Sequence, residues 1–217
     1  MLPPAIAMFS SLLKKHGHQC EIFDTTYYNL DYGMDSDGSK MERLNVVPYK
    51  MEEKGIKKKE SNWKDDLHSQ VNRFKPDLLA VSSTEDMWEL GMKVINELRE
   101  YKIKNNIPVI AGGVFATFAP EICIKEDLID IVCVGEGENA LIDLCKKIEM
   151  GENFDDLTNC WVKTIGPEYL KDRNIIKKNP ISKPVDINES PMIDISMFEE
   201  NRLYRPMAGK VYKMIPV

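Results

Sequence analysis

The chain has 217 residues, of which 43% are hydrophobic and 29% are charged, and its formal net charge is -6. This length and composition suit one α/β domain with an appendage, and the acidic balance argues against nucleic acid or an anionic membrane as a partner. No apolar run approaches the roughly 20 residues of a membrane-spanning helix, and no signal peptide is recognisable, so we expect a cytoplasmic protein.

A helix and a strand are the first predicted elements. Apolar residues recur at helical spacing from Pro4 to Lys15, and Gly17 follows as a stop signal. His18–Phe23 alternates polar and apolar residues, as strands do. A parallel α/β sheet would place a strand before this helix, and we expect that strand to be missing or supplied from outside the chain. Residues 25–61 lack a clear pattern and are interpreted as an insertion.

Strands and helices then alternate along the chain. The predicted strands are 78–81, 107–111 and 130–134, and the predicted helices are 63–74, 86–104, 120–125 and 139–150. Parallel strands need crossover connections of this length. The sequence therefore predicts an α/β fold of the doubly wound, flavodoxin-like (Rossmann-like) type, with a parallel sheet and helices on both faces.

The pattern changes after Gly151. A short strand is predicted at 160–164, a long stretch interrupted by prolines follows, and Tyr212–Val217 resembles the start of another strand. We therefore expect residues 1–151 to form the α/β domain and residues 152–217 to form an extended C-terminal arm or linker.

Small and polar residues fill the turns after the three predicted strands. Ligands of open parallel sheets bind beyond the carboxyl ends of the strands, where glycine permits close approach and hydroxyl and amide groups can hydrogen-bond. Each residue also has a structural explanation, such as ending a strand or capping a helix. The candidate cofactor-binding residues are Ser82, Ser83, Thr84, Gly112, Gly113, Val114, Thr117, Gly135, Glu136 and Gly137.

The sequence argues against a nucleotide site and against a metal site. Gly135 and Gly137 do not complete a GxGxxG motif, and Glu136 and Glu138 would repel a pyrophosphate. The five cysteines form no CxxC or CxxxCxxC pattern. We therefore predict no protein-bound metal.

Short motifs occur in a distinctive order through most of the chain. They are Pro3-Pro4, Leu13–His18, Ile22–Thr26, Lys75–Asp77, Val81–Ser83, Pro108–Gly113, Pro120-Glu121 and Asp130–Glu138. This set resembles the cobalamin-binding N-terminal domain of radical S-adenosylmethionine (SAM) enzymes, a group that includes anaerobic magnesium-protoporphyrin IX monomethyl ester cyclases and cobalamin-dependent methyltransferases.

The resemblance implies a module that holds cobalamin for methyl transfer or redox chemistry. A radical SAM domain of the same polypeptide, absent from this chain, would then carry the [4Fe-4S] cluster, bind SAM and act on a small-molecule substrate. The resemblance therefore implies no catalysis by this chain alone. His16, His18 and His68 do not stand in the Asp-x-His-x-x-Gly motif of other cobalamin modules, which implies that no histidine lies below the cobalt. Two alternatives stay open: a flavodoxin-like or receiver-like module without cobalamin, and a chain that binds nothing because its first strand is missing.

Overall fold

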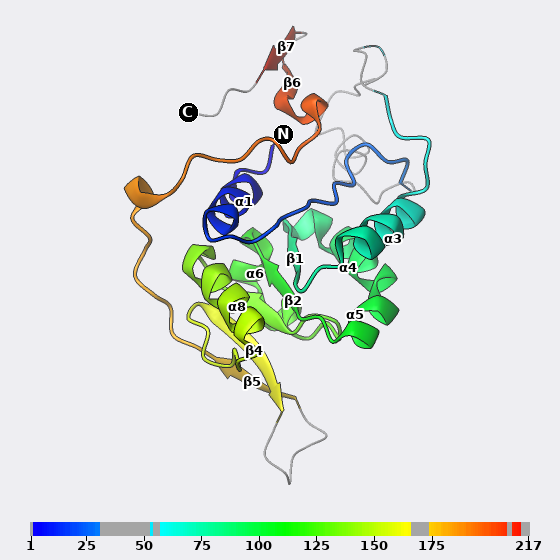
Figure 1. Ribbon diagram of the computed structural model, residues 1–217. Helices are drawn as coiled ribbons and strands as arrows, with labels where there is room; N and C mark the ends of the chain where they lie inside the picture. The colour runs from blue at the N-terminus through cyan, green and yellow to red at the C-terminus, as the bar shows by residue number, and fades with distance from the viewer. Residues whose placement is uncertain (1, 31–52, 54–56, 166–173, 208–209, 214–217) are drawn as a thin grey trace. The chain divides into compact units, whose positions relative to one another are not determined.

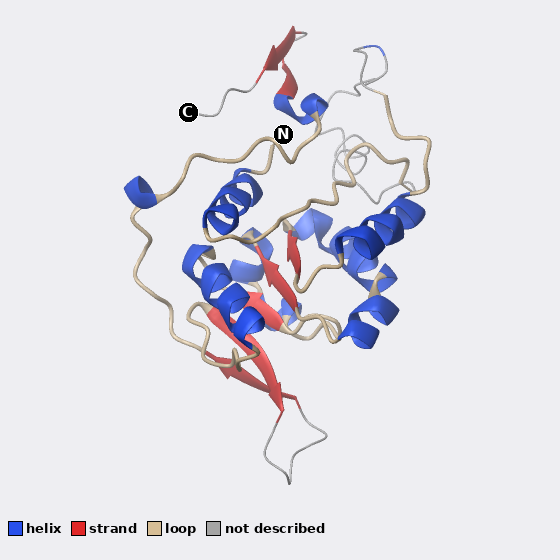
Figure 2. Cartoon of the chain, in the orientation of Figure 1, coloured by secondary structure: helices blue, strands red, loops and turns tan. Residues whose placement is uncertain are grey.

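The computed structural model describes residues 2–30, 53, 57–165, 174–207 and 210–213 (Figures 1 and 2). The chain divides into two compact units, unit 1 with residues 1–24 and 185–217 and unit 2 with residues 25–184. Most of the predicted insertion at 25–61 lies outside the described residues. None of the helices in the described part of the chain is both long and apolar enough to cross a membrane.

Unit 2 is built on a five-stranded sheet with the order β1-β2-β3-β4-β5. The strands are β1 (Leu79–Ser82), β2 (Val109–Gly112), β3 (Ile131–Cys133), β4 (Cys160–Ile165) and β5 (Asn174–Lys178). β1, β2 and β3 are parallel, whereas β4 and β5 extend the sheet as an antiparallel ladder, drawn in red in Figure 2. The predicted α/β fold is confirmed, although the sheet is mixed and β5 was not predicted.

Helices α3 and α8 of unit 2 lie where the sequence predicts helices. The full set is α3 (Trp63–Phe74), α4 (Trp88–Glu97), α5 (Arg99–Asn105), α6 (Val114–Phe118), α7 (Pro120–Cys123) and α8 (Glu138–Met150), with a 3-10 turn at Glu85–Met87. The side chain of Asn62 caps α3 by accepting a hydrogen bond from the Lys64 amide at 2.9 Å. Gly151 ends α8 with φ +67°.

The single helix predicted at 86–104 is divided into α4 and α5. Leu98 lies at the junction with φ -93° and ψ 9°, so the helical hydrogen-bonding pattern is interrupted there. The Leu98 side chain is only 2% exposed and remains in the core. Helix α6 was not predicted either, because five residues are too few to reveal a helical period.

Both faces of the central strands are covered. Neighbouring residues of a strand point to opposite faces. On one face, Val109, Ala111 and Val132 form a buried cluster with side chains of α4, α6 and α7. On the other face, Ile110 and Ile131 are also buried, at 3% and 0% exposure. The prediction that helices cover both faces of the sheet agrees with this burial.

Unit 1 begins with α1 (Pro4–Lys15), whose bounds match the prediction. The strand predicted at His18–Phe23 is wrong, because these residues carry no strand. The predicted alternation is nevertheless visible in burial, with residues 18, 20 and 22 half-buried and residues 19 and 21 exposed. A period of two determines which side chains are buried, but it does not provide the backbone ladder that defines a strand.

The C-terminal part of unit 1 contains a hairpin and two short 3-10 turns. The elements are 3-10 turns at Ile187–Glu189 and Glu200–Leu203, β6 (Tyr204–Met207) and β7 (Lys210–Lys213). The strand predicted from Tyr212 overlaps the end of β7, and residues 214–217 lie outside the described part.

Asp194 links α1 to the segment that follows Val185. Its carboxylate accepts hydrogen bonds from Ser10 Oγ at 2.7 Å, from Lys14 Nζ at 2.5 Å and from the Ser196 amide at 2.9 Å. Burial raises the pKa of Asp194, but the hydrogen bonds outweigh burial and hold the pKa well below its ordinary value. The ionised carboxylate therefore stabilises unit 1.

We predict that Asp194→Asn lowers the free energy of unfolding by about 1.5–3 kcal/mol at pH 7, the usual contribution of hydrogen bonds to a charged group. The folded-state pKa lies below the unfolded value of about 3.9, so this contribution is present above that pH and is lost as pH falls through the folded-state pKa. Urea unfolding followed by circular dichroism should show the difference between variant and parent narrowing below about pH 4. The exposed Glu189, changed to Gln, is the control. A difference that does not change with pH would contradict the assignment.

Candidate functional site

The three predicted turns lie at the same edge of the sheet. β1, β2 and β3 are parallel, with Ser82 opposite Gly112 and Ala111 opposite Val132, so their carboxyl ends meet. We call this the C-terminal edge and define it by residues 82–84, 112–117 and 135–137. All ten predicted site residues lie within it.

Gly113 packs closely against the turn that follows β1. A Cβ atom built on Gly113 would lie 2.8 Å from Ser82 Oγ and 3.0 Å from the Ser83 carbonyl oxygen. The residue also has φ +93°, a conformation that favours glycine. Ligand contact by Gly113 stays a prediction, and the structure gives the residue a packing role that brings the first two turns together.

Thr117 joins the second turn to the third. Its hydroxyl donates a hydrogen bond to the Gly113 carbonyl oxygen at 2.9 Å and accepts one from the Gly135 amide at 3.1 Å. One side chain on α6 therefore sets the distance between the two glycine turns. Thr117 was predicted as a site residue, and its observed contacts are with the protein backbone.

Asn159 supports the third turn through side-chain hydrogen bonds. Its side-chain amide donates to the Glu136 carbonyl oxygen at 2.8 Å, and its side-chain oxygen accepts from the Ser182 amide at 2.6 Å. The main-chain carbonyl oxygen of Asn159 accepts a hydrogen bond from the Val134 amide at 2.7 Å. Sequence reasoning missed Asn159, although an asparagine directly before a predicted strand is a turn signal and φ is +64° here.

The C-terminal edge is open and carries apolar side chains. A Cβ atom on Gly135 would meet no heavy atom within 4 Å. Val114 of this edge and Phe118, the residue that follows the edge on α6, are 62% and 83% exposed. The hydroxyl of Ser83 is buried and has no hydrogen-bond partner among the described residues. A broad, largely apolar ligand with hydrogen-bonding groups at its rim fits such a surface.

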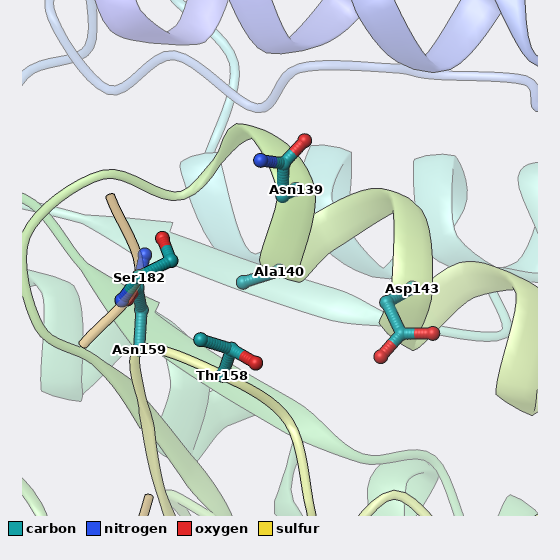
Figure 3. A pocket seen from close by; sticks show the side chains of 6 residues that line it. All are labelled: Asn139, Ala140, Asp143, Thr158, Asn159 and Ser182. Atoms are coloured by element: carbon teal, nitrogen blue, oxygen red, sulfur yellow. The ribbon is translucent and has the colours of Figure 1, made fainter. Parts of the chain in front are cut away.

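Two pockets among the described residues of unit 2 are lined by other residues. One, of about 240 Å³, is shown in Figure 3 and is lined by Asn139, Ala140, Asp143, Thr158, Asn159 and Ser182. A wider one of about 580 Å³ lies beside α4 and includes Trp63, Trp88 and Leu128. None of the ten predicted site residues lines either cavity. We base the site on the converging turns, because a ligand held over a sheet edge needs no enclosed cavity in the protein alone.

The described residues offer no ready metal ligands. His68 lies in α3, where its Nε2 is 3.1 Å from Glu97 Oε1. His16 caps α1, and His18 follows it in unit 1. Among the described residues, no group of three or more histidine, cysteine, aspartate or glutamate side chains could hold a metal ion.

We predict that Gly113→Ala destabilises the chain more than Gly135→Ala. Both glycines have positive φ, so each variant has a backbone cost of about 1–3 kcal/mol. Only at residue 113 does the new methyl group clash with Ser82 and Ser83, which adds about 1–3 kcal/mol. Urea midpoints of the two variants measure the difference directly, and equal midpoints would remove Gly113 from its packing role.

One family model matches the part of the chain that contains these turns. Residues 50–144 match the model described as B12 binding domain. This range contains β1, β2 and β3 and all ten predicted site residues. The family match therefore covers the C-terminal edge itself.

Two curated relatives are similar over much of this chain. An uncharacterized methyltransferase of Pyrococcus horikoshii is 23% identical over 128 residues, which are 58% of this chain and 26% of that protein. The anaerobic magnesium-protoporphyrin IX monomethyl ester cyclase of Rubrivivax gelatinosus is 22% identical over 149 residues, which are 68% of this chain and 26% of that protein. The chain thus spans about a quarter of the length of these relatives.

Two solved structures of the radical SAM methyltransferase TsrM from Kitasatospora setae share the fold. One holds tryptophan and a SAM analog, with a TM-score of 0.57 and 19% identity over 85% of this chain and 28% of that one. The other holds cobalamin and a [4Fe-4S] cluster, with a TM-score of 0.56 and 18% identity over 84% and 29%. The resemblance of this chain to the cobalamin-binding domain of radical SAM enzymes is therefore confirmed, and residues 50–144 match the B12 binding domain.

Proposed function

We propose that this chain is the cobalamin-binding module of a radical SAM enzyme and holds the corrin across its C-terminal edge. The observation that carries the proposal is the convergence of three small-residue turns at one open edge, inside the range that matches the B12 binding domain. Cobalamin, when bound, supplies a cobalt centre that can carry a methyl group or exchange electrons. The protein's contribution is to bind and orient it.

The residues of the C-terminal edge fit such a ligand. Gly135 leaves open space above the third turn. Val114 and Phe118 can cover an apolar ring system and exclude water from it. The buried hydroxyl of Ser83 lacks a partner among the described residues and can hydrogen-bond an amide of the ligand. Thr117 keeps the second and third turns at a fixed separation beneath the ligand.

The radical chemistry belongs to a partner in this proposal. The [4Fe-4S] cluster and SAM would be held by a radical SAM domain of the same polypeptide, since the chain spans about a quarter of its curated relatives and its five cysteines form no cluster motif. The substrate would be a small molecule, acted on by methyl transfer or a related reaction. A cytoplasmic location, expected from the sequence, is part of the same proposal.

We predict that the purified chain retains hydroxocobalamin after desalting and that Gly112→Leu retains at least about tenfold less, because each loss of about 1.4 kcal/mol in binding is a factor of ten. A Cβ on Gly112 would lie 3.9 Å from Cys133 Cβ, an ordinary contact, so a side chain can begin at this position of the edge without a clash at its first atom. The absorption spectrum of the desalted protein measures retention, and circular dichroism checks the fold.

The control for Gly112→Leu is Asp77→Leu, which adds the same side chain at an exposed position before β1, at the opposite end of the strands. Asp77→Leu should retain cobalamin like the parent. A parent chain that retains FMN and no cobalamin would instead favour the flavodoxin-like alternative. If the parent chain retained neither FMN nor cobalamin, it would not bind a cofactor as an independent module.

We also predict that no protein imidazole coordinates the cobalt. The sequence contains three histidines and none stands in an Asp-x-His-x-x-Gly motif. Electron paramagnetic resonance of the cob(II)alamin form should therefore give the same nitrogen splitting whether the protein carries ¹⁴N- or ¹⁵N-histidine. A splitting that changes with the histidine isotope would show that a histidine binds the metal, and a signal from the cofactor's own base would not change.

A further inference from the structure

Cys133 and Cys160 lie directly opposite each other in the antiparallel pair of β3 and β4. The next pair along, Val134 and Asn159, is hydrogen-bonded, with the Val134 amide donating to the Asn159 carbonyl at 2.7 Å. Hydrogen-bonded and non-hydrogen-bonded pairs alternate, so the cysteines occupy a non-hydrogen-bonded pair, where Cα atoms lie about 4.5 Å apart and side chains are closest. That separation falls within the roughly 4.4–6.8 Å that a disulfide spans.

The two thiols already interact. The interaction between the two side chains lowers the pKa of Cys133 and raises that of Cys160. The Cys133 thiol in turn lies 3.7 Å from the Glu136 carbonyl oxygen. Both side chains are buried, at 5% and 0% exposure. The two thiols are thus paired inside the protein and shielded from solvent.

The remaining cysteines differ in their surroundings. Cys123 is fully buried at the end of α7, and burial raises its pKa to about 11. Cys20 lies in unit 1, and Cys145 is a half-buried residue of α8. Among the described strands, pairing sets only Cys133 and Cys160 opposite each other. Strand register therefore selects this pair.

We propose that Cys133 and Cys160 form a redox modification site, a dithiol that a small two-electron oxidant converts to a cross-strand disulfide. One sulfur–sulfur bond forms, both sulfur–hydrogen bonds break, and two electrons and two protons pass to the oxidant. With diamide the azo nitrogen–nitrogen double bond is reduced to a hydrazine, which balances the step. Because both thiols are buried, oxidation proceeds through small reagents and local opening of the strand pair.

The disulfide would act on the third turn of the C-terminal edge. The chain between the two cysteines contains residues 135–137 and helix α8, so the bond closes a loop around them. Cys133 lies two residues before the turn, and Asn159, which supports the turn, is next to Cys160. The disulfide would therefore hold together the strand that leads into the turn and the strand whose neighbouring residue, Asn159, supports it. The site itself rests on strand geometry and does not require that cobalamin binds.

The test uses the whole 217-residue chain, purified reduced and then treated with diamide. The protein should lose two of its five alkylatable thiols and 2 Da of mass, and peptide mapping should join the peptides of Cys133 and Cys160. Dithiothreitol should restore both thiols. The oxidised form should unfold at a higher urea concentration than the reduced form, because the closed loop restricts the unfolded chain.

Single alanine variants separate the pair from the other thiols. Cys123→Ala should still form the bond, whereas Cys133→Ala should lose it, and the same result is expected for Cys160→Ala where that variant folds. Non-reducing gels identify bonds between molecules through the half-buried Cys20 or Cys145. A native chain that keeps all five thiols, or joins other cysteines, would overturn the proposal, and a diamide-treated urea-unfolded sample confirms that the reagent is active.

Discussion

The close approach of Gly113 to Ser82 and Ser83 is the contact on which the C-terminal edge depends. With a side-chain atom 2.8 Å from the position of a Cβ, the first two turns can meet only if residue 113 is glycine. α6 begins at the next residue, and its Thr117 is hydrogen-bonded to both Gly113 and Gly135. The separation of all three turns therefore follows from one steric constraint and one hydroxyl group.

The antiparallel strands β4 and β5 give this edge a second support. Asn159, only 4% exposed, satisfies its buried amide with the Glu136 carbonyl and the Ser182 amide. A buried amide left without these partners would be strongly unfavourable, so the turn and the strand ladder hold each other in place. The same strand pair brings Cys133 against Cys160. The pairing of β3 with β4 therefore both supports the third turn and creates the proposed redox site.

The sequence alone was sufficient to predict features that depend on residues close together in the chain. Helices α1 and α3 begin and end at the predicted residues, because helical periodicity, caps and glycine stops are encoded within about one turn of each helix end. The ten candidate residues meet at one edge because they follow parallel strands, and parallel topology follows from the alternation of strands and helices. Their roles toward a ligand stay a prediction, while Gly113 and Thr117 have observed structural roles.

The remaining features depend on contacts between distant residues. Alternation at 18–23 correctly indicated burial but not the absence of a strand, because strand formation requires a hydrogen-bonding neighbour that periodicity does not specify. Strand register also determines three further features. They are the position of β5, the support of the third turn by Asn159 and the Cys133–Cys160 pair. The sequence by itself determined the longer helices, the three parallel strands and the edge where small residues gather. Only the tertiary structure decided which backbones pair, because pairing energy is shared between segments far apart in the chain.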